Sequence, residues 1–152
     1  MSMGAAPDRP ERFKLPAAVS LLLVHDGKIL LCRRKDTGWQ DGKYGFMAGH
    51  IDGGESFTAT LCREAMEELG ITVEPRDVRF AHLQHNTVDG EYVYVFFVAE
   101  KWQGEPRIRE PHKCDNIRWF PMDKLPDDLV YGTADVIGHY LGGVFYSESG
   151  FN

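Results

Sequence analysis

Apolar and polar positions alternate along this chain in a way that predicts several short strands and two helices. The strand-like segments cover residues 17–24, 28–34, 44–51, 78–86, 91–101 and 116–121. The turn at His25-Asp26-Gly27 joins the first two segments into a predicted hairpin. Within 91–101, residues 92–99 are apolar on both faces, which is typical of a central strand. The predicted helices cover residues 56–69, ended by Gly70, and 133–141.

The first predicted helix has two contrasting faces. Glu64, Glu67 and Glu68 stand at i, i+3 and i+4 and share an arc of about 100°. Repulsion between like charges at this spacing costs a few tenths of a kcal/mol per pair, roughly. A solvated acidic face is one interpretation, and a site for a hard divalent cation such as Mg²⁺ or Mn²⁺ is the other. The residues predicted to face the core are Ala59, Cys62, Ala65, Met66 and Leu69.

Length and charge narrow the classes of function. A chain of 152 residues fits a single domain, expected over residues 15–152, after a loose polar tail over 1–14. The net charge of −6 and the absence of a Lys/Arg block argue against long nucleic acid as a partner. Three cysteines without metal-ligand spacing are read as reduced thiols. No apolar run reaches membrane-spanning length and no signal peptide is evident, so a cytoplasmic protein, monomer or homodimer, is expected.

Residues 49–71 resemble the Nudix box, which reads Gly, five residues, Glu, seven residues, Arg-Glu, two residues, Glu-Glu, one residue, Gly and an aliphatic residue. Every one of these positions is present: Gly49, Glu55, Arg63, Glu64, Glu67, Glu68, Gly70 and Ile71. Only Ala65 is smaller than the aliphatic residue usual at its position. The resemblance implies an α/β (α+β) fold, an α/β/α sandwich around a mixed sheet. It also implies metal-dependent hydrolysis of a phosphoanhydride in a nucleoside diphosphate linked to another group.

The resemblance also implies roles for individual residues. Glu67 and Glu68 are expected to bind Mg²⁺ or Mn²⁺ together with the Gly49 carbonyl, and Glu64 is expected to be a ligand or the base that activates water. Arg63 is expected to pair with Glu55 and fix the loop against the helix.

Two segments outside the box complete the expected site. The strand end at Arg33 and Arg34 is expected to face the substrate phosphates, with Arg34 the stronger candidate. The loop over 102–113 contains a Gly-Glu-Pro segment that, in similar triphosphatases, precedes a glutamate of the metal site; by position that residue is Glu110.

The substrate is less sharply indicated. A nucleoside triphosphate pyrophosphatase, giving monophosphate and pyrophosphate, is favoured by the size and by the 102–110 loop. Residues 129–133 lack the Asn that enzymes for oxidised guanine carry there, which argues against an oxidised purine. Hydrolysis of ADP-ribose, another NDP-sugar or a dinucleoside polyphosphate, and a non-catalytic nucleotide sensor, remain alternatives. Trp39, Tyr44 and Trp119 are candidates either for base stacking or for the core.

Overall fold

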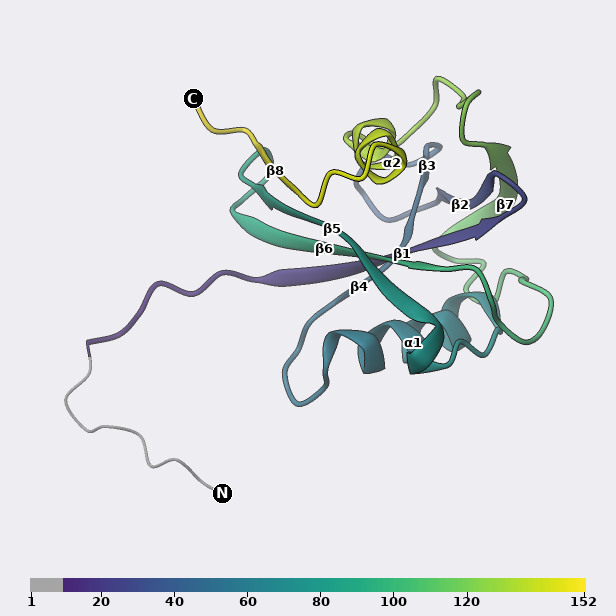
Figure 1. Cartoon of the computed structure of the whole chain (residues 1–152), viewed down its shortest axis with the longest axis horizontal. Helices are drawn as coiled ribbons and strands as arrows, with labels where there is room; N and C mark the ends of the chain where they lie inside the picture. Colours follow the sequence, from purple (N-terminus) through teal and green to yellow (C-terminus); the bar gives the residue numbers. More distant parts are fainter. Residues whose placement is uncertain (1–9) are drawn as a thin grey trace.

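A computed structural model describes residues 10–152, which form one eight-stranded sheet with a helix on each face (Figure 1). The strand order is β3-β2-β1-β6-β5-β8, with β4 paired to β1 and β7 paired to β2. The strands are β1 (Ala17–His25), β2 (Lys28–Arg34), β3 (Tyr44–Gly45), β4 (Met47–His50), β5 (Val78–Asn86), β6 (Tyr92–Ala99), β7 (Cys114–Pro121) and β8 (Tyr146–Ser149). The helices are α1 (Phe57–Leu69), the short 3-10 helix η1 (Pro75–Asp77) and α2 (Thr133–Leu141).

The sheet is mixed, because β1 pairs with β6 and β5 pairs with β8 in parallel while the other pairs are antiparallel. Helices α1 and α2 lie on opposite faces of the sheet in Figure 1. The predicted α/β/α sandwich is therefore confirmed. So is the predicted central strand at 92–99, since β6 is hydrogen-bonded on both sides.

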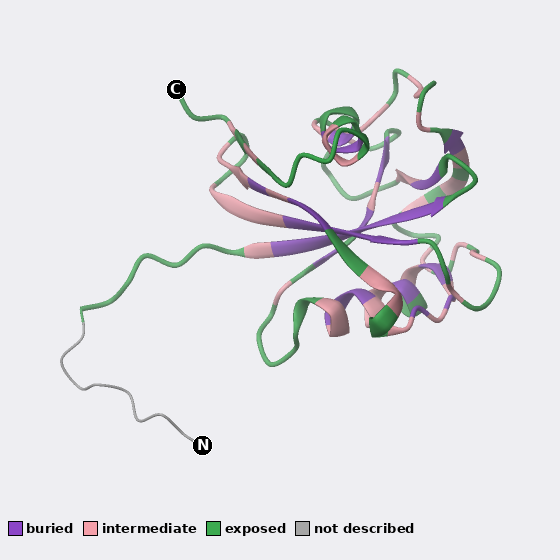
Figure 2. Cartoon of the chain, in the orientation of Figure 1, coloured by how far each residue is buried: buried purple, intermediate pink, exposed green. Residues whose placement is uncertain are grey.

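Alternation along β1 divides the core into two layers. Leu21 and Leu23 belong to the layer under α1, whereas Leu22 and Val24 belong to the layer under α2. All four are at most 5% exposed. Figure 2 shows the same central strands buried along most of their length. Burial on both faces explains why β1 lacks the polar alternation of a surface strand.

Local sequence signals define both ends of α1. The Ser56 side chain accepts a hydrogen bond from the Ala59 N–H at 3.1 Å, which is an N-cap. Gly70 ends the helix in the left-handed conformation, with φ 67°, and its N–H donates to the Met66 carbonyl. The start near Ser56 and the stop at Gly70 are thus confirmed.

The predicted core stripe of α1 is partly wrong. Met66 is 39% exposed, and Ala59 and Cys62 are only half-buried. The buried residues are Thr60, Leu61, Ala65 and Leu69. The buried face of α1 is thus centred closer to the glutamates than predicted.

This difference gives a stability prediction. Leu61 is 1% exposed within the core layer under α1, so Leu61→Ala is expected to lower the free energy of unfolding by about 2–5 kcal/mol. Met66→Ala, the matched control, should cost less than about 1 kcal/mol. Urea unfolding followed by circular dichroism measures both values. Equal losses in the two variants would contradict the observed orientation of α1.

The single strand expected over 44–51 is two strands separated at Phe46. Residue Gly45 of β3 pairs with β2, whereas Met47 of β4 pairs with Leu21 of β1. The segment changes partner at Phe46 because β1 pairs with β2 only near its C-terminal end, from Leu23 onward. Hydrophobic periodicity indicates a strand but does not indicate which strand it pairs with. The break at Phe46 could therefore not be predicted from the sequence.

The C-terminal segment forms a strand where none was predicted. Residues Tyr146–Ser149 are β8, which pairs in parallel with β5. The side chains of Phe145, Tyr146 and Phe151 stay 48–62% exposed. Phe145 nevertheless stacks on Phe80, with ring centroids 6.0 Å apart, and the Phe151 ring lies 4.6 Å from that of His85.

The remaining expectations concern the termini and the cysteines. The predicted tail falls largely on residues 1–9, outside the described part of the chain, and residues 10–16 are exposed and carry no helix or strand. The three cysteines are free thiols, as predicted. Among the helices of residues 10–152, none combines the length and apolar character needed to cross a bilayer.

Candidate active site

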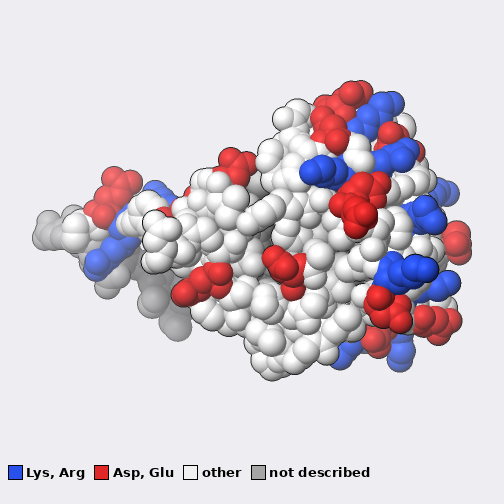
Figure 3. Space-filling view, turned by 90° about the horizontal axis from the view of Figure 1, so that it is seen from above, with Lys and Arg blue, Asp and Glu red and all other residues white. Residues whose placement is uncertain are grey.

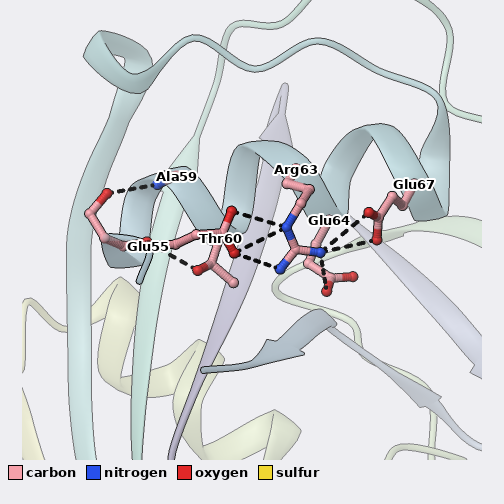
Figure 4. A network of polar contacts seen from close by, with 7 residues as sticks. Glu55, Ala59, Thr60, Arg63, Glu64 and Glu67 are labelled. Atoms are coloured by element: carbon pink, nitrogen blue, oxygen red, sulfur yellow. Dashed lines mark hydrogen bonds and ion pairs between the residues drawn. The ribbon is translucent and has the colours of Figure 1, made fainter. Parts of the chain in front are cut away.

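Arg63 organises the loop and helix that carry the box residues (Figure 4). Its Nη2 lies 2.9 Å from Glu55 Oε1, and its Nε lies 3.1 Å from both oxygens of that carboxylate. Its Nη1 lies 3.2 Å from Glu64 Oε1 and 3.2 Å from Glu67 Oε2. These bonds raise the pKa of Arg63, and Arg63 lowers the pKa of Glu55. The expected pairing of Arg63 with Glu55 is present, and Arg63 also offsets the repulsion between Glu64 and Glu67.

Glu68 lies next to Glu64 but makes no ion pair with Arg63. Burial, followed by the negative charges of Glu64 and Glu110, raises the pKa of Glu68 to about 9, while Lys113 acts in the opposite direction. Glu64, one helical turn before Glu68, and Glu110, from the 102–113 loop, thus both lie close enough to act on the Glu68 carboxylate. Because Arg63 does not reach Glu68, this glutamate lies in excess negative charge.

Glu110 reaches the site because its loop is fixed to the end of α1. The Arg107 N–H donates to the Leu69 carbonyl at 3.0 Å, and the Arg109 N–H donates to the Glu68 carbonyl at 3.1 Å. The carbonyls at the end of a helix have no partner within the helix, so the loop supplies their missing donors. The same contacts place Glu110 beside Glu68 in the cleft described below.

Gly49 is required by the position of Glu64. A Cβ on Gly49 would lie 2.7 Å from Glu64 Cγ and 3.0 Å from both Cδ and Oε1. Residue 49 lies on β4, so the strand passes directly beneath the Glu64 side chain, which is 16% exposed. The turn glycines Gly53 and Gly54 adopt φ +96° and +82°, which most other residues avoid.

These residues fit a hard divalent cation in donor type and charge. Within residues 10–152, no three Asp, Glu, His or Cys side chains already stand together as a ligand set. The available donors are the carboxylates of Glu64, Glu67, Glu68 and Glu110 and the carbonyl of Gly49, with Glu67 hydrogen-bonded to Arg63. Oxygen donors of this kind suit Mg²⁺ or Mn²⁺. The raised pKa of Glu68 shows that added positive charge would relieve repulsion there.

A pH prediction follows from Glu68. The pKa of Glu68 is higher in the folded protein than in the unfolded chain. Between the two pKa values the folded protein keeps the proton and the unfolded chain has lost it, so the free energy of unfolding falls as the pH rises. With metal removed by EDTA, the Glu68 contribution should therefore lower the unfolding midpoint as pH rises from about 6 to 9. Mg²⁺ competes with this proton and should flatten the slope. Calorimetry of the wild type and Glu68→Gln tests this, and identical slopes in the two proteins would contradict it.

A cleft of about 820 Å³ opens beside these carboxylates, a volume within the range of ligand sites. Figure 3 shows charged side chains gathered at one end of the face that carries α2, with mostly uncharged surface toward the N-terminal tail. The Arg, Lys, His, Asp, Glu and Cys residues lining the cleft are Cys32, Arg33, Arg34, Asp36, His50, Glu68, Asp89, Glu110, His112, Lys113 and Cys114. Both predicted arginines are thus in the same cleft as three of the predicted metal ligands, Gly49, Glu68 and Glu110.

The two arginines differ in their partners. Arg33 Nε donates to Asp115 Oδ1 at 2.6 Å, so a carboxylate already balances its charge. Arg34 Nε donates to the Trp39 carbonyl at 2.8 Å and its guanidinium lies 5.0 Å from the Trp39 ring centroid. Its side-chain partners within residues 10–152 are uncharged, including the Thr37 hydroxyl. The charge of Arg34 is therefore the more available to an anion.

The candidate stacking residues separate clearly. Trp39 lines the cleft, but Tyr44 is 4% exposed in the core and Trp119 packs on Trp102 with ring centroids 6.0 Å apart. Stacking roles for Tyr44 and Trp119 are therefore wrong. The sequence reading missed Tyr92 and Tyr94, which line the cleft. Their spacing of two places them on one face of β6, a signal hidden by the apolar run around them.

Comparison with known proteins agrees with this architecture. The family model described as the NUDIX domain matches residues 14–140. The crystal structure of a MutT NUDIX hydrolase from Burkholderia pseudomallei superposes with a TM-score of 0.75 and 28% identity, covering 84% of this chain and 98% of that one.

Curated relatives cover different shares of the chain. It is 31% identical over 97 residues to 8-oxo-dGTP diphosphatase of Escherichia coli (strain K12), covering 64% of this chain and 74% of that protein. It is 29% identical over 123 residues to oxidized purine nucleoside triphosphate hydrolase of Danio rerio, covering 73% of each. Similarity to NAD-capped RNA hydrolase NudC of Mycobacterium tuberculosis reaches 38% over 60 residues, but covers only 18% of that protein. The chain accordingly belongs to the Nudix family and is a MutT-like pyrophosphohydrolase.

Proposed function

We propose that this protein hydrolyses nucleoside triphosphates to monophosphate and pyrophosphate with Mg²⁺ or Mn²⁺. The observation that carries the proposal is the presence of Glu68, Glu110 and Arg34 around one cleft of about 820 Å³. Acidic donors and a cation within one cleft suit a metal-bound polyphosphate. Two relatives that act on nucleoside triphosphates, by their names, support this substrate class over the alternatives.

Each group has a proposed part in the reaction. Glu64, Glu67, Glu68, Glu110 and the Gly49 carbonyl would hold the cation. The cation supplies charge neutralisation at the phosphoryl oxygens and a more acidic bound water. Arg34, assisted by Arg33, binds and orients the phosphates. Arg63 holds Glu55, Glu64 and Glu67, and so positions the box loop.

The proton of the attacking water requires a base, and Glu64 or Glu68 is suited to it. Glu64 accepts a hydrogen bond from Arg63 Nη1 at 3.2 Å, and its side chain lies against Gly49 of β4. The pKa of Glu68 is raised, so Glu68 holds a proton more readily once one is transferred. A catalytic pKa near the working pH is best for proton transfer.

A nucleotide panel tests the proposal. Purified protein is incubated with Mg²⁺ and each of the common ribo- and deoxyribonucleoside triphosphates, ADP-ribose and a dinucleoside tetraphosphate, and the products are separated by chromatography. Monophosphate with pyrophosphate from triphosphates is expected. Release of orthophosphate, or cleavage confined to ADP-ribose or the dinucleotide, would overturn the assignment. Binding without any product would indicate a sensor.

A further inference from the structure

A directed chain of hydrogen bonds connects the C-terminal strand to the wall of the cleft. Within the described residues it runs from strand β5 to β8 and the segment before it. We call it the amide relay; its members are Val88, Asn86, Gln84, Ser147, His82 and Val144. Gln84 and Asn86 line the cleft at the opposite end of the sheet from the arginines.

In the half of the relay formed by Val144, His82 and Ser147, the donor and the acceptor of each hydrogen bond are fixed. His82 Nδ1 lies 2.7 Å from the Val144 carbonyl, which can only accept, so Nδ1 carries the proton. His82 is 0% exposed, and burial lowers its pKa, so the ring is neutral and Nε2 accepts. The Ser147 hydroxyl, 2.7 Å away, must then donate to Nε2. Its oxygen is left to accept from Gln84 Nε2 at 3.1 Å.

In the half formed by Val88, Asn86 and Gln84, the backbone N–H of Val88 fixes which atom donates and which accepts. The Val88 N–H can only donate, and it donates to Asn86 Oδ1 at 2.8 Å. The Asn86 Nδ2 therefore faces Gln84 and donates to Gln84 Oε1 at 2.8 Å. Both ends of the relay impose the same amide orientation, so neither Gln84 nor Asn86 can flip without breaking two bonds.

Each amide keeps one N–H after these bonds are made. An amide nitrogen has two N–H groups, and Gln84 and Asn86 each use one. Within residues 10–152 the second N–H of each has no protein acceptor. The two side chains stand two residues apart on one face of β5 and both line the cleft, so this wall offers two neighbouring donors. Opposite them on β6 stand Tyr94 and Tyr92, whose rings stack with centroids 5.4 Å apart.

The position of this wall suits the base of a nucleotide. Arg34 at the end of β2 and the two amides on β5 line the same cleft from different strands of the sheet. A nucleotide with its phosphates near Arg34 would bring its base toward Gln84 and Asn86. Guanine presents two adjacent acceptors, N7 and O6, whereas adenine presents one acceptor and one amino donor there.

We propose that Gln84 and Asn86 recognise the N7 and O6 acceptors of guanine, so that the preferred substrate is an unoxidised guanine nucleotide; this rests on the function proposed above for the phosphate end of the cleft. Oxidation of guanine at C8 places a hydrogen on N7 and turns that acceptor into a donor. A wall of two N–H donors disfavours such a base. Ser147 and His82 are positioning residues that hold the amides in this orientation.

The first test compares bases in the wild type and in a variant of the wall. The kcat/KM for GTP should exceed those for ATP and 8-oxo-GTP by about tenfold or more. Asn86→Asp replaces the amide donor with an acceptor and should lower kcat/KM for GTP about tenfold while changing that for ATP less. His85→Gln is the matched control, since His85 lies between the two amides in sequence, pairs with Glu91 and does not line the cleft. Its GTP to ATP ratio should stay at the wild-type value.

The second test addresses the relay itself. Ser147→Ala removes the acceptor that holds Gln84, and it should raise KM for GTP several-fold with kcat little changed. Ser147→Thr keeps the hydroxyl and should restore KM. A merely structural role for Ser147 would change the thermal midpoint or kcat without this base-dependent change in KM.

Nucleotide binding without turnover tests the role of Gln84 and Asn86 independently of the proposed hydrolysis. Calorimetric titration with GMP, AMP and 8-oxo-GMP needs no turnover, and GMP is expected to bind about tenfold tighter than the other two. Equal affinities for GMP and AMP, or an unchanged GTP to ATP ratio in Asn86→Asp, would overturn the role of the amides even if triphosphates are hydrolysed. Failure of the reaction with tight GMP binding would instead overturn the proposed function alone.

Discussion

Replacing Glu68 with Gln is expected to lower kcat by about 100- to 1000-fold while the protein stays folded. Glu68 is half-buried in the cleft beside Glu64 and Glu110, and Arg63 does not neutralise it. The amide keeps the size of the side chain but removes the charge that would hold a cation. The expected loss in rate corresponds to about 3–4 kcal/mol of transition-state stabilisation. Steady-state turnover at saturating Mg²⁺ and the preferred triphosphate measures the effect.

Glu105→Gln is the matched control for this substitution. Glu105 lies in the same loop as Glu110 but is exposed, and it is not among the residues that line the cleft. Its turnover should equal that of the wild type. Removal of the charge at Glu68 also removes its repulsion with Glu64, so Glu68→Gln should unfold at the same or a higher temperature without metal. Wild-type kcat in Glu68→Gln would rule out Glu68 as a metal ligand.

Adding a single methyl group at residue 49 should have nearly as large an effect. In Gly49→Ala the new Cβ would meet Glu64 at 2.7–3.0 Å, closer than real contacts of this kind. Because β4 is hydrogen-bonded to β1, the Glu64 side chain has to move. A displacement near 1 Å of a catalytic group costs about 100-fold in rate. We expect a loss of that size in kcat.

Gly138→Ala provides the comparison for Gly49→Ala. Gly138 lies within α2, and a Cβ there would meet nothing within 4 Å. That variant should keep full activity and be slightly more stable, since Ala favours a helix over Gly by about 1 kcal/mol. If Gly49→Ala keeps wild-type activity, Glu64 does not need its observed position. A crystal structure of the variant would show where the carboxylate moved.

The parts of the fold that sequence could predict are those with strong local signals. The cap at Ser56, the stop at Gly70 and the hairpin turn at Asp26-Gly27 each depend on residues within a few positions. The break at Phe46 depends on which strand pairs with which, a long-range property that periodicity does not carry. The same holds for β8, where the polar residues Ser147 and Glu148 gave no strand pattern.

The candidate site divides in a similar way. The residues from Gly49 to Glu68 were identifiable because their spacing is a specific pattern, and Glu110 because of its distance from a short loop motif. The residues along the β5 wall were not, since a single amide in a strand is common and carries no signal of its own. Their importance arises only when β8 brings Ser147 to Gln84, 63 residues away in the sequence.

The placement of β8 separates two properties that evolution could alter independently. The groups proposed for bond cleavage are concentrated on α1 and the loop before it, whereas the orientation of the wall opposite depends on Val144 and Ser147. Exchange of the β8 segment among related enzymes could therefore redirect the choice of nucleotide while leaving α1 untouched.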